Sequence, residues 1–113
     1  MMHTYLFKYS ETLLKGYKLQ KKYVTDAERS GDTRSPNYDL FKTNTLLVER
    51  FLKDLEEKGQ PGWPDICKSV YFEKEKQKTV ADLYGMSLRT LQRILKKCLI
   101  LFDEVYDHAG LYE

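Results

Sequence analysis

Basic, hydroxyl and amide side chains follow one another through residues 87–97, and no acidic residue lies among them. These residue types suit contacts with DNA, because arginine can read guanine, glutamine can read adenine, and serine, threonine or lysine can bind bases or phosphates. Where Leu91, Ile94 and Leu95 form the inward side of a helix, the remaining side chains face outward. We therefore predict one set of DNA-binding residues, consisting of Thr79, Ser87, Arg89, Thr90, Gln92, Arg93, Lys96 and Lys97.

Residues 77–97, QKTVADLYGMSLRTLQRILKK, predict two helices joined by a tight turn at Gly85. Thr79, with Asp82 three residues later, predicts the start of the first helix, and Ser87 predicts the start of the second. Gly85 suits the positive φ that commonly ends a helix, and Ala81 is small where the helices must approach each other. Apolar residues at helical spacing predict a shared core, formed by Val80, Ala81 and Tyr84 before the turn and by Leu88, Leu91, Ile94 and Leu95 after it.

This pattern is typical of a helix-turn-helix, in which the second helix enters the DNA major groove and its first turns reach base edges. We expect base contacts from residues 87–96, and phosphate contacts from Lys96 and Lys97 further along the helix. Thr79 and the amides of the helix that begins there are expected to hold another phosphate. The alternative is a bent helical pair with a solvated basic face.

The N-terminal half predicts a helical hairpin. Residues 4–29 and 36–58 each carry an apolar stripe at helical spacing, and the sequence SGDTRSP at residues 30–36 interrupts the pattern. We expect the lysines of the first helix to form a solvated face rather than a DNA contact. These lysines are Lys15, Lys18, Lys21 and Lys22.

The C-terminal half predicts a unit of three helices. After a break at residues 59–64, a short helix at residues 65–72 turns Ile66, Cys67 and Val70 inward, and a charged loop follows. The last helix continues to about Asp107, and its apolar side must dock on the hairpin or on a second subunit. We therefore predict an all-α fold, with an N-terminal helical hairpin at residues 1–60 and a C-terminal trihelical helix-turn-helix with a long last helix at residues 61–113. The two units are short enough to form one compact domain.

Composition excludes several classes of protein. In a chain of 113 residues, 42% hydrophobic and 32% charged residues suit a soluble helical protein. No apolar run approaches the roughly 20 residues of a membrane span, and the N-terminus lacks a signal-peptide pattern, so we expect a cytoplasmic protein with no membrane partner.

Catalysis and metal binding are not expected either. Cys67 and Cys98 lie in apolar helical patterns, which favours reduced core thiols. No closely spaced metal ligands, phosphate-binding glycine loop or Ser–His or Cys–His constellation is present, so we predict no metal, no cofactor and no catalytic residue.

Charge is distributed unevenly along the last helix. The whole chain carries a net charge of only +2, yet residues 86–97 hold four basic residues and no acidic one. Residues 98–113 hold four acidic residues, expected on a solvated end, and no lysine or arginine. The acidic block limits how far DNA can follow this helix. Its members are Asp103, Glu104, Asp107 and Glu113.

The stretch DICKSVYFEKEKQKTVADLYGMSLRTLQRILKKCL resembles region four of bacterial sigma factors. It is also similar to the small phage-encoded regulators of the ArpU and RinA type, which share that trihelical unit. The resemblance covers roughly the last half of the chain and implies that residues 87–97 read promoter or operator DNA in the major groove. The N-terminal half does not resemble a sigma core-binding region, so a stand-alone regulator of phage or prophage genes is the better inference.

Other partners and functions remain as alternatives. The hairpin or the acidic end could bind RNA polymerase or another phage protein, which would make the chain a protein-interaction module. A DNA-recognition subunit of a phage packaging terminase would share the helix-turn-helix. Pairing of two subunits through the hairpin would give a homodimer.

Overall fold

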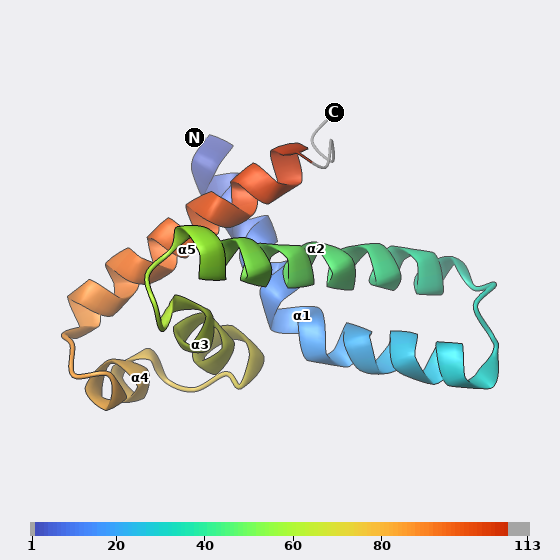
Figure 1. The fold of residues 1–113 in the computed structure, drawn as a ribbon, viewed down its shortest axis with the longest axis horizontal. Helices are drawn as coiled ribbons and strands as arrows, with labels where there is room; N and C mark the ends of the chain where they lie inside the picture. Colours follow the sequence, from blue (N-terminus) through green and yellow to red (C-terminus); the bar gives the residue numbers. More distant parts are fainter. Residues whose placement is uncertain (1, 109–113) are drawn as a thin grey trace.

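The computed structural model describes the backbone of residues 2–108 and the side chains of residues 10–104. This part of the chain contains helices and no strand, which confirms the predicted all-α class (Figure 1). None of the helices within it is long and apolar enough to cross a membrane. In chain order the elements are α1 (Met2–Ser30), α2 (Pro36–Lys58), α3 (Trp63–Cys67), the π-helical η1 (Lys68–Phe72), α4 (Gln77–Leu83) and α5 (Leu88–His108).

Both ends of α2 are fixed by local signals that the sequence displays. At its start, the Ser35 hydroxyl accepts a hydrogen bond from the Asn37 N–H at 3.1 Å, and Pro36 takes the first helical position. At its end, the Gly59 N–H donates to the Leu55 carbonyl at 2.9 Å. The observed bounds therefore agree with the predicted helix at residues 36–58.

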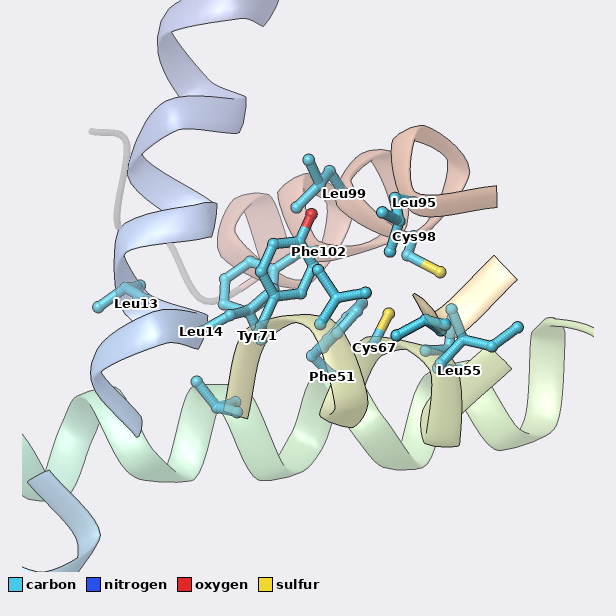
Figure 2. Close-up of a cluster of buried hydrophobic side chains, with 14 of the residues drawn as sticks. Leu13, Leu14, Phe51, Leu55, Cys67, Tyr71, Leu95, Cys98, Leu99 and Phe102 are labelled. Atoms are coloured by element: carbon cyan, nitrogen blue, oxygen red, sulfur yellow. The ribbon is translucent and has the colours of Figure 1, made fainter. Parts of the chain in front are cut away.

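Helix α1 changes direction along its length (Figure 1). Its first part, which carries Leu13 and Leu14, crosses α2 steeply, whereas its remainder runs beside α2 (Figures 1 and 2). Polar contacts tie the two helices together: the Tyr17 hydroxyl donates to Glu49 at 2.6 Å, and the Lys21 ammonium lies 2.8 Å from the same carboxylate. Long side chains thus fasten α1 to α2 beside the core.

One buried apolar cluster joins every helical element of the chain. The rings of Phe51 on α2 and Phe102 on α5 lie 4.8 Å apart at its centre, and both side chains are fully buried (Figure 2). Val80 and Ala81 of α4 and Tyr71 of η1 belong to the same cluster. Burial of each large apolar side chain contributes about 1.5–3 kcal/mol. The long helix α5 therefore docks on α1 and α2, which is one of the two partners that its apolar side predicted, and the two halves of the chain share one core.

The short helix predicted at residues 65–72 is present but changes its winding. Its first turns form α3, and its second half winds as the wider π-helix η1. Ile66, Cys67 and Val70 are buried as expected. The π-helix was not predicted, because an apolar pattern in eight residues does not distinguish one helical winding from another.

Cys67 and Cys98 are both buried and unbridged, as predicted. Their sulfur atoms face one another between α3 and α5 (Figure 2). The neighbouring Cys98 thiol, followed by burial, raises the pKa of Cys67 far above its ordinary value. Because the thiolate is the reactive form, this environment suits core thiols that are chemically inert.

Candidate nucleic-acid interface

The turn between α4 and α5 is a helix C-cap built around Gly85. Gly85 has φ +67°, its N–H donates to the Asp82 carbonyl at 3.1 Å, and the Met86 N–H donates to the Ala81 carbonyl at 2.9 Å. These two bonds are those of a Schellman motif, which closes a helix end on a left-handed residue. The predicted turn is therefore present, and it joins the two helices within four residues.

The N-cap of helix α4 lies three residues earlier than predicted. The helix starts at Gln77 after Lys76, which makes no side-chain capping bond, so Thr79 lies within the first turn instead of at the N-cap. The prediction that Thr79 caps α4 is wrong, because Lys76 is the N-cap. The predicted phosphate contact of Thr79 stays a prediction. The Thr79 side chain is nevertheless exposed.

Ser87 begins α5 as predicted. Its hydroxyl oxygen accepts a hydrogen bond from the Thr90 N–H at 3.1 Å and lies 3.0 Å from the Thr90 hydroxyl, to which it donates. Both side chains are therefore occupied in the cap that starts the helix. The cap alone accounts for a serine and a threonine at these positions, and their predicted contacts with DNA stay predictions.

The packing of α4 against α5 agrees with the predicted small core except near the turn. Val80, Ala81, Leu91 and Leu95 are buried, and Ile94 is half-buried. Ala81 has almost no exposed surface, so its small size permits the close helix approach.

Two side chains assigned to this core lie outside it. Leu88 remains 41% exposed and Tyr84 38% exposed. Leu88 is the first residue of α5, and no other element covers it there. Helical spacing alone could not show this, because a first-turn position lacks neighbours from a preceding turn.

An exposed row of four polar or basic side chains runs along the open side of α5. These residues, called the recognition row below, are Arg89, Gln92, Arg93 and Lys96. They are spaced by three and four residues, so they share one helix face. Leu91, Leu95 and Cys98 bury the opposite face. The structure thus brings these four predicted residues together. Thr90 and Lys97 lie to one side of the row, and Arg93 is the member of the row next to them by helical spacing.

The cations of the recognition row differ from the lysines of α1. Lys15, Lys18 and Lys21 lie within 2.8–3.7 Å of the carboxylates of Glu11, Glu73 and Glu49 respectively. Among the side chains of residues 10–104, Arg89, Arg93 and Lys96 have no such ion pair. Three of the four α1 lysines predicted to form a solvated face are therefore ion-paired at the surface, whereas Lys22 and the three α5 cations are exposed without such a pair among the described side chains.

The recognition row continues onto the start of α4. The Gln92 side-chain amide donates to the Gln77 side-chain oxygen at 3.4 Å, so the beginning of α4 lies beside the second turn of α5. Lys76 and Lys78, which flank Gln77, are exposed. None of these three was predicted as a site residue. Only the position of α4 across α5 brings them near the row.

The acidic end of α5 is less solvated than expected. The Ser10 hydroxyl, itself buried, donates to the Asp103 carboxylate at 3.0 Å and links α1 to α5. Asp103 is thus only partly exposed, whereas Glu104 faces solvent. The side chains of Asp107 and Glu113 lie outside the described residues. The side chains of α5 therefore change from basic to acidic where this helix packs against α1.

Comparisons of this chain with protein families, curated proteins and solved structures found no match. What the site can do therefore has to be judged from its own geometry. An exposed helix face with two guanidinium groups, one amide and one ammonium presents hydrogen-bond donors and one acceptor in a line. In DNA, the edges of stacked bases and the phosphates beside them offer acceptors and donors that could pair with these groups.

Proposed function

We propose that this protein is a sequence-specific DNA-binding transcriptional regulator and that α5 is its recognition helix. The observation that carries the proposal is the recognition row, which stands exposed on a helix whose other side is buried in the core. Arg89 and Arg93 offer paired donors that suit guanine, and Gln92 offers a donor and an acceptor that suit adenine. Lys96, Lys97 and the exposed lysines flanking Gln77 supply charge for phosphates.

The arrangement around the row supports the same function. Helix α4 packs across α5 through a four-residue turn, which is how the first helix of a helix-turn-helix holds the second in the major groove. On this proposal α3 with η1, α4 and α5 form the trihelical helix-turn-helix unit, and α1 with α2 forms the hairpin that supports it. The buried contact of Phe51 with Phe102 holds α5 rigidly on that support.

The resemblance to sigma region four and to ArpU- and RinA-type regulators gives the proposed biological setting. It favours a cytoplasmic phage or prophage regulator that reads an operator or promoter. RNA polymerase and a second subunit are the proposed protein partners. A terminase-like DNA-recognition subunit would use the same helix and differ by forming ring-shaped oligomers.

Binding of a protein partner by α1 and α2 is the second candidate function. The observation that favours it is an open apolar hollow of about 480 Å³, whose lining includes Leu19, Tyr23 and Phe41. Leu19 is 78% exposed and Tyr23 39% exposed, so the hollow presents contiguous apolar surface, which is the feature that marks interaction sites. A tight protein partner combined with no salt-dependent DNA binding would favour this function over the first.

Selection of bound sequences from random double-stranded DNA at two salt concentrations tests the proposal. Base reading enriches one sequence at both concentrations, whereas attraction to phosphates alone enriches none and falls steeply with salt. Arg93→Ala should weaken binding to the selected sequence by about 1–3 kcal/mol and relax the choice of base at one position. Lys97→Ala should weaken all sequences alike. A protein that stays folded but enriches no sequence would contradict the proposal.

A further inference from the structure

The side chain of Gln92 on α5 forms a hydrogen bond with a residue of α4. Its Nε2 atom donates to Oε1 of Gln77 at 3.4 Å, and this hydrogen bond joins the recognition row to α4. Gln92 is exposed, whereas Gln77 is half-buried at the first position of α4. Val80 and Leu91 fix the backbones of the two helices relative to each other, since both are fully buried.

This hydrogen bond decides which groups Gln92 presents to a ligand. A glutamine amide has two N–H donors on Nε2 and one acceptor oxygen, Oε1. Because Gln77 accepts one of the two hydrogens, Nε2 of Gln92 is turned toward α4. The second hydrogen and Oε1 are then left for the open side, where they form an adjacent donor and acceptor.

An adjacent donor and acceptor distinguishes adenine from the other purine. In the major groove adenine presents the acceptor N7 beside the donor N6–H₂, whereas guanine presents the two acceptors N7 and O6. The oriented Gln92 amide can donate to N7 and accept from N6 of adenine at once. It cannot satisfy both acceptors of guanine, which instead match the donors of Arg89 and Arg93.

We propose that Gln77 is a positioning residue that orients the Gln92 amide to read one adenine in the DNA site. The inference rests on the proposed function of α5, and it adds a residue from α4 and a base identity to it. Gln77 contacts Gln92 and not the base. Its contribution is to order the Gln92 side chain before DNA binds, so that binding costs less side-chain conformational entropy.

The test begins with the sequence selected by the wild-type protein. Gln92→Ala identifies the position at which adenine is read, because the preference for adenine there should fall by about 5- to 150-fold. Replacing that adenine by 7-deazaadenine, which lacks the N7 acceptor, should weaken wild-type binding and leave Gln92→Ala unaffected. These two measurements establish the adenine contact without touching Gln77.

Two matched variants then separate positioning from stability. Gln77→Leu removes the acceptor at similar size, and should reduce the adenine preference by about 2- to 10-fold. Gln77→Glu keeps an acceptor for Gln92 and should retain the preference, although its charge weakens binding to all sequences. A merely structural role would change the melting temperature or the affinity for every sequence, and would leave the ratio between bases unchanged.

The possible outcomes distinguish this inference from the proposed function. If the wild-type protein selects a sequence but Gln77→Leu retains the full adenine preference, the positioning role is wrong and DNA reading by α5 stands. If Gln92→Ala changes no base preference, the adenine contact is wrong as well. If no sequence is selected, the proposed function fails and the inference falls with it.

Discussion

Substitution of Gly85 by alanine isolates the backbone cost of the turn that places α5. Gly85 has φ +67°, and a Cβ atom added there would meet no other atom within 4 Å. Steric clash with neighbours is thus absent, and the cost comes from placing an L-residue in the left-handed region. That cost is roughly 1–2 kcal/mol, reduced by about 0.4–1 kcal/mol because alanine also has fewer unfolded conformations. We expect Gly85→Ala to destabilise the fold by about 1 kcal/mol.

Gly16 provides a matched control with the opposite expected sign. It lies inside α1, its φ is not positive, and an added Cβ would approach only the mobile end of Gln20, at 3.3 Å. Because glycine in a helix interior is less favourable than alanine by about 1 kcal/mol, Gly16→Ala should stabilise the protein by up to that amount. The same chemical change is therefore predicted to lower stability at one site and raise it at the other.

Urea denaturation followed by circular dichroism at 222 nm (a helix signal) measures both variants. The midpoints should move in opposite directions with unchanged slope, and the melting temperature of Gly85→Ala should fall by about 4 °C. Gly85→Asn, which tolerates the left-handed region, should lose less than Gly85→Ala. Equal shifts at the two glycines, or no loss at Gly85, would refute the description of the turn as a strained cap that requires glycine.

Two further predictions concern the cap of α5 and the contact between α1 and α2. Ser87→Ala should cost about 1 kcal/mol in urea unfolding, whereas Thr90→Val should cost less because the N–H that Ser87 accepts is retained; equal losses would count against the cap. Burial acts to raise the pKa of Glu49, but hydrogen bonds from Lys21 and Tyr17 outweigh it and hold this pKa below its ordinary value of 4.5. Its contribution to stability is therefore complete above about pH 4.5 and is lost as the pH falls through the lower folded-state pKa. Thermal unfolding should show a smaller difference between pH 7 and pH 3 in Glu49→Gln than in the wild type, and an unchanged difference would contradict this role.

Local signals in the sequence were sufficient to locate most helix boundaries. Ser35 with Pro36, Gly59 and Gly85 each act through their own backbone or the next few residues, so their effect does not depend on the tertiary fold. The apolar side of α5 likewise predicted that this helix docks on the hairpin or on a second subunit, and the structure shows the first of these. The all-α class followed from these signals together.

Contacts between distant residues could not be predicted in the same way. The hydrogen bond between Ser10 and Asp103 joins residues 93 positions apart, so no periodic pattern contains it. The exposure of Leu88 depends on whether another element covers the first turn of α5, and the start of α4 depends on how the chain leaves η1. Thr79 was therefore predicted as an N-cap that in the structure lies three residues earlier, at Lys76.

Some features of the candidate site could be predicted from local sequence, and others depend on contacts between helices. Spacing alone placed Arg89, Gln92, Arg93 and Lys96 on the outward side of a helix, together with Ser87, Thr90 and Lys97. The occupation of Ser87 and Thr90 in a cap, and the contact of Gln77 with Gln92, required the arrangement of α4 against α5.

The most direct test compares two double variants that remove the same charge from different places. Arg89→Ala with Arg93→Ala alters the recognition row, and Arg29→Ala with Arg34→Ala alters exposed arginines at the turn between α1 and α2, at the opposite end of the molecule (Figure 1). Affinity for the selected DNA is measured by fluorescence anisotropy at two salt concentrations, after circular dichroism has shown both proteins folded. Two base contacts of about 1–3 kcal/mol each predict a loss of roughly 30-fold or more for the first variant and a small change for the second. Unchanged affinity in the Arg89/Arg93 variant, or equal losses in the two variants, would contradict base reading by α5.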